Sequence, residues 1–310
     1  MMKTQKNKGK IRYRKLLLCL LAAVFLLGVL LYALGLGFLY FSSALEGTRD
    51  GFPNDGKPMY SLFVGIDQSD PAKADAAVLI SMNLQKQEMT VISLPPSTQM
   101  EKEKNPSLQL QDVYASGGAE GTKSAVENLL HIRISRYAVL NEENFQKLID
   151  GSGGLDLYVE KNMVHESQDG QPDIQIRQGY QTLKDGEALG YIRYIDGHDQ
   201  IGRIQREERF MKSFLAYHQK NMGMTNWVMA YRHWNALESN ITQTEAASFS
   251  YRMTYFPGER VHFMILPGEW QTYQGQPIWA VNPVDIQKII GVTLNQEQDK
   301  GDQNGTTGTH

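Results

Sequence analysis

The feature that most constrains this chain is an unbroken apolar run near its N-terminus, from Leu16 to Phe41. The run is about 26 residues long and uncharged, whereas a helix needs only about 20 residues to cross the hydrocarbon core of a bilayer. A buried helix of a globular domain would show polar residues that break the run, and there are none. Residues 16–41 are therefore predicted to form one transmembrane helix.

The residues on either side of this run indicate how it is inserted. Residues 1–15 form a basic tail without an acidic residue, and flanks rich in lysine and arginine stay in the cytoplasm. A cleavable signal peptide has an apolar region of only about 7–15 residues, and Ser42-Ser43-Ala44 is a weak cleavage motif. We therefore predict a retained, single-pass anchor in the cell membrane, with a cytoplasmic N-terminus and an extracellular C-terminal domain.

The only cysteine of the chain, Cys19, lies inside the predicted span. The outer part has no thiol, which excludes disulfides, cysteine-ligated metals and a cysteine nucleophile there. An extracellular domain of this size without disulfides is more typical of a bacterium than of a eukaryote. The net charge of −3 argues neither for nor against a charged partner.

After a linker at residues 42–56, strand and helix patterns alternate along the chain. Strands are predicted at Tyr60–Ile66, Asp75–Leu84, Glu88–Leu94, Tyr137–Leu140, Leu155–Val159 and Val261–Leu266. Helices are predicted at Gly121–His131, Glu142–Ile149, Leu183–Gly190, Asp199–His218, Trp227–Leu237, Thr244–Met253 and Pro283–Ile290. With no internal repeat, these patterns predict one α/β domain at residues 57–292, in three layers with a central mixed sheet between helices. Residues 293–310 are predicted to be a disordered tail.

An arginine-rich stretch from Glu187 to Phe210 carries the strongest chemical signal. We expect Asp199 to cap a helix that carries Arg203 and Arg206 three residues apart on one face. Guanidinium groups at that spacing suit the oxygens of a phosphate or pyrophosphate, which arginine binds through two nitrogens. The alternative is an ordinary charged helix, in which the two glutamates after Arg206 pair with the arginines.

Short segments in a fixed order then connect the chain to a known family. They are Leu62–Asp67, Asp75, Val91–Pro95, Tyr114–Gly118, Val126–Leu130, Leu148–Asp150, Gly153–Asp156, Ala188–Arg193, Asp199–Arg206, Asn240–Thr242 and Leu266–Glu269. Each segment alone is a weak signal, but their order behind a basic tail and a single span is specific. In this order the outer region resembles the LytR-CpsA-Psr family of bacterial cell-envelope proteins, as a divergent member.

The resemblance implies a membrane-anchored enzyme that assembles the envelope of a Gram-positive bacterium. Such enzymes bind glycopolymers linked to undecaprenyl (pyro)phosphate, such as teichoic acid or capsule, and transfer the phospho-glycan to peptidoglycan. Arginines bind the pyrophosphate, two aspartates hold Mg²⁺, and an apolar tunnel between sheet and helices takes the prenyl chain. This chemistry is physically sensible, because Mg²⁺ prefers carboxylate and phosphate oxygens and a leaving phosphate needs fixed cations. The family is also associated with removal of phosphate from such lipids.

The resemblance assigns these roles to positions of this chain. Asp67 and Asp75 match the two aspartates that bind the metal. Lys73 stands where the family has a substrate-binding arginine. It keeps the positive charge but lacks the paired N–H donors of a guanidinium group. The catalytic set, whose arginines also bind substrate, is Arg193, Arg203, Arg206 and Asp199.

The chain departs from the family at several positions. The segment Pro95–Thr98 replaces Pro-Arg-Asp-Thr, Gln109 and Gln111 replace a lysine and an asparagine, Ile195 replaces an arginine, and Glu207 replaces a glutamine. Each lost charge-assisted hydrogen bond removes about 2–4 kcal/mol of transition-state stabilisation. Two functions therefore stay open: an active phosphotransferase, and a catalytically degenerate relative that binds prenyl-phosphate lipid or wall-assembly partners without turnover.

Two further points bear on this choice. Lys102 and Lys104 follow the altered Pro95–Thr98 segment and are candidates to replace a missing cation. Binding of nucleic acid is excluded, because the cytoplasmic tail at residues 1–15 is too small to hold a DNA-binding domain.

Overall fold

A computed structural model of the chain describes residues 25–35, 37–38, 57–67, 73–101, 105–167, 170–197, 199–221, 234, 236–253 and 256–294. Of the helices in these ranges, none is both long enough and apolar enough to cross a bilayer. The predicted cytoplasmic tail at residues 1–15, the linker at residues 42–56 and residues 295–310 of the predicted disordered tail lie outside these ranges. So do Lys102, Lys104 and most of the predicted helix at Trp227–Leu237. The predicted span is described only at 25–35 and 37–38, so the anchor stays a prediction.

The centre of the domain is a six-stranded mixed sheet in the order β11-β6-β1-β2-β3-β12. The strands are β1 (Met59–Ile66), β2 (Ala74–Asn83), β3 (Glu88–Leu94), β6 (Ile134–Asn141), β11 (Glu238–Ser239) and β12 (Val261–Ile265). Strands β1, β2 and β3 form an antiparallel meander, while β6 joins β1 and β12 joins β3 in parallel. The C-terminal ends of β1, β3, β6 and β12 therefore meet at one end of the sheet, beside the start of β2.

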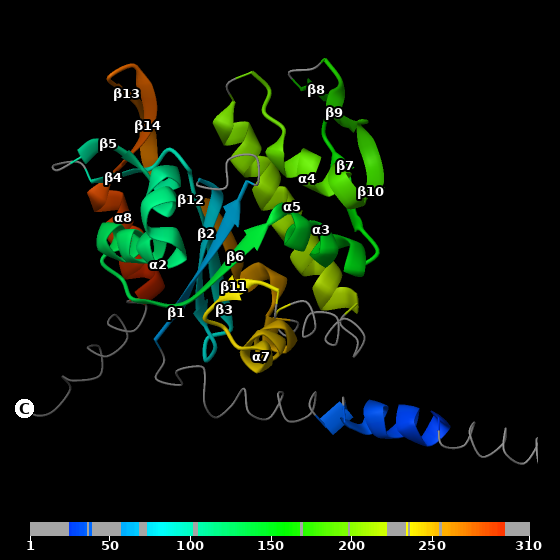
Figure 1. The fold of residues 1–310 in the computed structure, drawn as a ribbon. Helices are drawn as coiled ribbons and strands as arrows, with labels where there is room; N and C mark the ends of the chain where they lie inside the picture. Colours follow the sequence, from blue (N-terminus) through cyan, green and yellow to red (C-terminus); the bar gives the residue numbers. More distant parts are fainter. Residues whose placement is uncertain are drawn as a thin grey trace, which may run out of the picture.

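Helices cover both faces of this sheet, as Figure 1 shows. They are α2 (Leu110–Leu130), α3 (Glu142–Gly151), α4 (Asp185–Arg193), α5 (Gln200–Asn221), α7 (Gln243–Met253) and α8 (Pro283–Leu294). Helices α2 and α8 pack on one face, and α5 and α7 pack on the other. Helices α3 and α4 pack beside α5 around a smaller core of their own. The predicted α/β fold with a central mixed sheet is confirmed.

The two main cores follow from the alternation of side chains along each strand. In β1, Leu62 and Val64 pack with α2 and α8, whereas Met59 packs on the α5 and α7 side. In β2, Leu79 joins the first core and Met82 joins the second. Burial on both faces makes such strands nearly continuous apolar runs, which is why they were predictable from the sequence.

Four two-stranded ribbons surround the sheet, and the sequence predicted only one of their strands. They are β4 (Gln99–Glu101) with β5 (Asn105–Gln109), β7 (Leu155–Val159) with β10 (Gly179–Leu183), β8 (Met163–Glu166) with β9 (Pro172–Ile176), and β13 (Gly268–Tyr273) with β14 (Gln276–Val281). A short 3₁₀ helix, η1 (Gly258–Arg260), precedes β12. The other ribbon strands are short and mostly exposed, so their sequences lack the apolar pattern of the central sheet.

Two helix predictions need correction. The helix predicted at Gly121–His131 is the second half of α2, which begins at Leu110 and continues through a kink at Gly118 (φ 56°). Glycines in a sequence favour a loop, but here a single glycine with a positive φ forms the kink and the helix resumes after it. The helix predicted from Leu183 begins two residues later, because Leu183 pairs with Leu155 in the β7–β10 ribbon.

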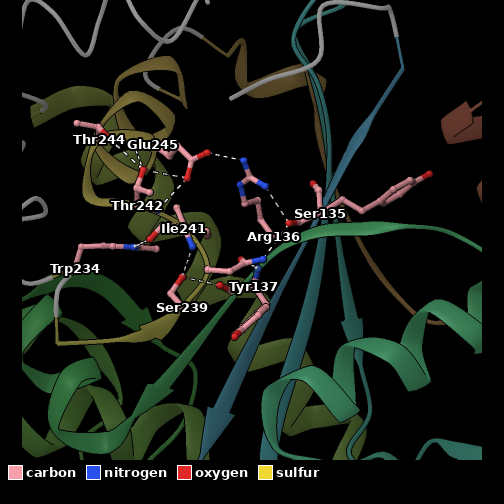
Figure 2. A network of polar contacts seen from close by, with 11 residues as sticks. Ser135, Arg136, Tyr137, Trp234, Ser239, Ile241, Thr242, Thr244 and Glu245 are labelled. Atoms are coloured by element: carbon pink, nitrogen blue, oxygen red, sulfur yellow. Dashed lines mark hydrogen bonds and ion pairs between the residues drawn. The ribbon is translucent and has the colours of Figure 1, made fainter. Parts of the chain in front are cut away.

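The Asn240–Thr242 segment has a structural role, part of which Figure 2 displays. The Asn240 side chain accepts a hydrogen bond from the Tyr137 N–H (2.7 Å) and donates one to the Ser135 carbonyl (3.1 Å). It thereby covers part of the β6 edge that the two-residue strand β11 leaves open. Thr242 and Glu245 form a reciprocal cap at the start of α7, with N···O distances of 3.2 and 2.9 Å. Glu245 also pairs with Arg136 of β6 at 2.5 Å.

Candidate functional site

The two predicted metal-binding aspartates lie at neighbouring strand ends. Asp67 follows the last residue of β1, and Asp75 is the second residue of β2. The antiparallel register pairs Ile66 with Ala74. Asp67 follows the first of these residues and Asp75 follows the second, so the two aspartates lie on neighbouring strands at the same end of the sheet. The pairing of β1 with β2, rather than sequence distance, brings them together.

Arg193 joins both aspartates, as the last residue of α4. Its guanidinium is hydrogen-bonded to the Asp67 carboxylate, and its Nε lies 3.7 Å from Asp75 Oδ2. Burial lowers the pKa of Arg193, but the hydrogen bond to Asp67 and the charges of Asp67, Glu142 and Asp75 together outweigh burial and raise that pKa overall. Arg193 is therefore charged at every physiological pH.

Arg203 binds Asp75 through both ends of its guanidinium, from the first turn of α5. Its Nη1 donates to Asp75 Oδ1 at 2.9 Å, and its Nη2 donates to the Asp75 main-chain carbonyl at 2.8 Å. The Arg203 side chain is only 6% exposed. This paired geometry fixes the direction of the guanidinium plane, which lysine could not do.

Asp199 starts α5, as predicted. Its Oδ1 accepts a hydrogen bond from the Gly202 N–H at 2.8 Å, and its carbonyl accepts one from the Arg203 N–H at 3.2 Å. A side chain at Gly202 would collide with the Asp199 carboxylate, because a Cβ there would lie 2.1 Å from Oδ2. The cap therefore sets the position of Arg203 by fixing the first turn of its helix.

Two glutamates that the resemblance did not assign complete the cluster. Glu142, the first residue of α3, places its Oε1 2.9 Å from Arg193 Nη2. Glu207, one turn after Arg203 in α5, places its Oε1 3.5 Å from Arg203 Nε. The sequence offered a signal for Glu207, which is spaced four residues from Arg203. It offered none for Glu142, whose position depends on the pairing of β6 with β1.

The cluster contains more negative than positive groups. Arg193 and Arg203 face the four carboxylates of Asp67, Asp75, Glu142 and Glu207. Burial raises the pKa of Glu207 to about 7, with the charge of Asp75 adding to the rise and Arg203 and Arg206 opposing it. The cluster therefore carries an excess of one negative charge when Glu207 is protonated and of two when it is ionised.

Arg206 points to a different set of partners. Its guanidinium is hydrogen-bonded to the Tyr194 carbonyl, stacks on the Tyr194 ring at 5.3 Å, and lies 3.6 Å from Glu160 Oε1. Glu160 also accepts from Arg209 at 2.8 Å and from the Tyr191 hydroxyl at 3.2 Å. These contacts hold the turn between α4 and α5, which carries Arg193 on one side and Arg203 on the other.

Lys73 lies before β2, with its Nζ 3.8 Å from Asp112 Oδ1 at the start of α2. Both side chains are largely exposed, so this pair contributes little to stability. Lys73 is two residues before Asp75 in the sequence, and its side chain contacts the start of α2.

The segment that replaces the family's Pro-Arg-Asp-Thr is built into the backbone of the domain. The buried Thr98 donates from both its N–H and its hydroxyl to the Pro95 carbonyl, at 2.9 and 2.6 Å. The Leu110 N–H donates to the Thr98 carbonyl at 2.9 Å, which attaches the first residue of α2 to this turn. The Gln109 side chain binds the Pro277 carbonyl of β14 at 3.0 Å. These residues organise the backbone and supply no cation.

An apolar cleft lies between the sheet and the two helices on the α2 side. Its walls include Tyr60 and Leu79 from the sheet, Leu130 from α2, and Ile286 and Ile290 from α8. Its free volume is about 10 Å³, room for no more than one water molecule.

A larger cavity of about 660 Å³ lies at the opposite end of β6 from the arginine cluster. Its charged lining is Lys123, Glu127, Arg133 and Arg136, with His131 beside them. Lys123 pairs with Glu120 and Glu127, and Arg136 pairs with Glu245. Because this cavity is distant from Asp67 and Asp75, the arginine cluster that contains both aspartates is the better candidate site.

Comparisons with known proteins all match the same family. The model of the LytR_cpsA_psr family matches residues 43–294. TagU of a Bacillus cereus strain, a polyisoprenyl-teichoic acid–peptidoglycan teichoic acid transferase, is 28% identical over 196 residues, or 61% of this chain and 62% of TagU. TagV of Bacillus subtilis, a transferase of the same description, is 26% identical over 51% of this chain and 43% of TagV. The chain thus spans less than two thirds of the length of these relatives.

Solved structures show the same fold. The crystal structure of B. subtilis TagV superposes with a TM-score of 0.67 at 20% identity, over 77% of this chain and 96% of TagV. TagT bound to LI-WTA superposes with a TM-score of 0.64 at 18% identity, over 80% of this chain and 95% of TagT. At such identities the likeness establishes the fold and leaves the chemistry to the residues of the site.

Proposed function

Because the chain belongs to the LytR-CpsA-Psr family, we propose that it is a membrane-anchored protein of cell-envelope assembly. In this proposal it binds glycopolymers linked to polyprenyl (pyro)phosphate and transfers the phospho-glycan to peptidoglycan. One observation carries the proposal: Arg193 and Arg203, from two consecutive helices, converge on Asp67 and Asp75 at adjacent strand ends.

The cluster suits a pyrophosphate because its cations are fixed before a ligand arrives. Arg203 is buried and held through two donors, so little side-chain entropy is lost when an oxyanion replaces a carboxylate as its partner. Arg193 is less buried, with 26% of its side chain exposed, and it is the arginine that an entering ligand reaches first. Both are placed to stabilise charge that develops on a leaving phosphate.

Asp67 and Asp75 also fit a magnesium ion. Mg²⁺ is usually bound by one or two carboxylates together with waters and substrate phosphates, rather than by an all-protein cage. The excess negative charge of the cluster also favours a cation. When bound, the ion would neutralise phosphate oxygens and so assist their departure.

The remaining parts of the proposal concern the lipid. An anchor at residues 16–41 would keep the domain at the outer membrane surface, where lipid-linked substrates are found. The apolar cleft beneath α8 supplies a surface for the prenyl chain once the helix moves. The identity of the glycopolymer is left open by the cluster, because its charged groups recognise phosphate rather than sugar.

A second candidate function is favoured by the altered positions. The Pro95–Thr98 turn carries no cation, and Glu207 partly neutralises Arg203 from a buried position. A protein with these changes would bind prenyl-phosphate lipid, or partners of the wall machinery, without turnover. The two candidates share the same binding residues and differ in whether phosphate is released.

One experiment separates these candidates. The full chain in detergent micelles is incubated with undecaprenyl pyrophosphate and Mg²⁺, and binding and phosphate release are measured together. Arg193→Ala and Arg203→Ala should each weaken binding, by at most about 2–4 kcal/mol, because each arginine exchanges a carboxylate for the ligand and the full loss of a truncated buried pair is an upper bound. Arg203→Lys keeps the positive charge but removes the paired N–H donors of the guanidinium group. Arg133→Ala is the control for loss of an arginine far from the cluster.

The outcomes differ clearly. Phosphate release that is lost in Asp75→Ala would establish an active enzyme. Binding without release would favour the degenerate relative. Unchanged binding in both arginine-to-alanine variants would mean that the binding site lies elsewhere.

A further inference from the structure

Two tyrosines on the β7–β10 ribbon are unusually exposed. Tyr180 exposes 88% of its surface and Tyr158 exposes 46%. The two residues are direct cross-strand partners, and their ring centroids lie 4.9 Å apart at an interplanar angle of 61°. Large aromatic side chains normally contribute to a core, so a paired aromatic surface in water suggests a binding role.

The tyrosines belong to a continuous outer face of the ribbon. Side chains alternate along a strand, and the register pairs Asp156 with Thr182 on the same face as the two tyrosines. The Thr182 hydroxyl donates to the Asp156 carboxylate at 2.5 Å. We name these four residues, Asp156, Tyr158, Tyr180 and Thr182, the tyrosine face. The opposite face, which includes Leu155 and Leu157, is buried against α3 and α5.

The ribbon is tightly connected to the arginine helices. Glu160, the residue after the end of β7, binds Arg206 and Arg209 of α5. In Figure 1 the ribbon stands on the α3–α5 side of the sheet, whereas α2 and α8, which enclose the apolar cleft, stand on the other side. The Arg193–Arg203 cluster lies between them, at the end of the sheet.

We propose that the tyrosine face binds sugar rings of the acceptor glycan strand, an inference that rests on the proposed function. The C–H groups on one face of a pyranose ring carry partial positive charge and attract the negative face of an aromatic ring. The Asp156 carboxylate and the Thr182 hydroxyl add acceptors and a donor for sugar hydroxyls.

Other occupants fit this face less well. A stable protein partner needs an interface of about 1,200–2,000 Å², far more than two tyrosine rings provide. A sugar ring needs only the face of one aromatic ring, with hydrogen-bonding groups beside it.

The test uses the full chain in detergent micelles and soluble peptidoglycan glycan strands from which the stem peptides have been removed. Tyr158→Ala and Tyr180→Ala should each lower glycan affinity about tenfold, the order expected for one aromatic contact. Tyr158→Phe and Tyr180→Phe keep the rings and should stay within about twofold of the unmodified chain. Val164→Ala removes an exposed apolar side chain from the neighbouring strand β8 and should have no effect.

Binding of undecaprenyl pyrophosphate is measured on the same samples. Tyrosine variants that lose glycan binding and keep lipid binding would support the proposal. Alanine variants that bind glycan as the unmodified chain does, or an unmodified chain that binds no glycan, would overturn it. An unmodified chain that binds glycan through the tyrosines but does not bind the lipid would refute the proposed function alone.

Discussion

The buried carboxyl of Glu207 makes the stability of this domain depend on pH in a direction opposite to that of most acidic residues. The pKa of Glu207 rises from its usual 4.5 to about 7 in the folded protein, chiefly because its side chain is only 14% exposed. A raised pKa means that the folded state favours the protonated carboxyl. The stabilisation is therefore fully present below pH 4.5 and is lost as the pH rises through 7.

The size of this effect follows from the shift. One pKa unit corresponds to 1.36 kcal/mol, so the ionised carboxyl makes the folded state about 3 kcal/mol less stable at pH 8 than the protonated carboxyl does. Glu207→Gln keeps the shape of the side chain and removes the titrating group. We therefore expect this variant to be about 3 kcal/mol more stable than the unmodified chain at pH 8 and within about 1 kcal/mol of it at pH 5.

Denaturant unfolding of both proteins, measured between pH 5 and pH 8, tests this expectation. Only the difference between the two free energies of unfolding is used, because other groups titrate in both proteins alike. Glu208→Gln is the matched control for the chemical change, since Glu208 lies on the same helix but is paired with Lys212 outside the arginine cluster. Parallel curves for the unmodified chain and Glu207→Gln over this range would refute the reasoning.

Two further substitutions test how the rest of the fold is held. Gly154→Ala should cost about 2–4 kcal/mol of unfolding free energy, because its φ is +95° and a Cβ would lie 2.6 Å from Lys184 Cγ and 2.9 Å from the Leu183 carbonyl. Gly153→Ala, with φ +82° but open space around it, isolates the backbone strain and should cost about half as much, so equal losses in denaturant unfolding would contradict a steric role. Glu245→Ala removes the α7 cap and the Arg136 pair together and should cost about 1–3 kcal/mol without changing lipid binding. Thr242→Ser keeps the capping hydroxyl as its control, and altered lipid binding in Glu245→Ala would mean that this region is coupled to the site.

The sequence predicted the central strands well because their residues are buried on both faces. It predicted Asp67, Asp75, Arg193 and Arg203 as one site through the order of family segments, and the structure does bring these four side chains together. The roles assigned to them stay proposals. The prediction that Asp199 caps α5 was correct, because capping depends on residues close in sequence.

Other parts of the site depend on contacts between distant residues, which a single sequence does not reveal. Glu142 reaches Arg193 only because β6 lies beside β1. The chain order gave no sign that Arg206 turns toward Glu160 and Tyr194 instead of joining Arg203. The polar ribbons were missed for a related reason, since their pairing depends on partners rather than on an apolar pattern of their own.

The ion pairs of the cluster also determine how a ligand must bind. Arg193 and Arg203 are already satisfied by carboxylates, so a pyrophosphate gains only the difference between two sets of charge-assisted hydrogen bonds. Each arginine that turns to the ligand leaves Asp67 or Asp75 without its cation, at a cost that a divalent ion bound to the same carboxylates would remove. Lipid and Mg²⁺ should therefore bind cooperatively, each raising the affinity for the other by the same factor. A cluster with bare arginines would bind the lipid without the ion, and the carboxylates around Arg193 and Arg203 argue against that behaviour.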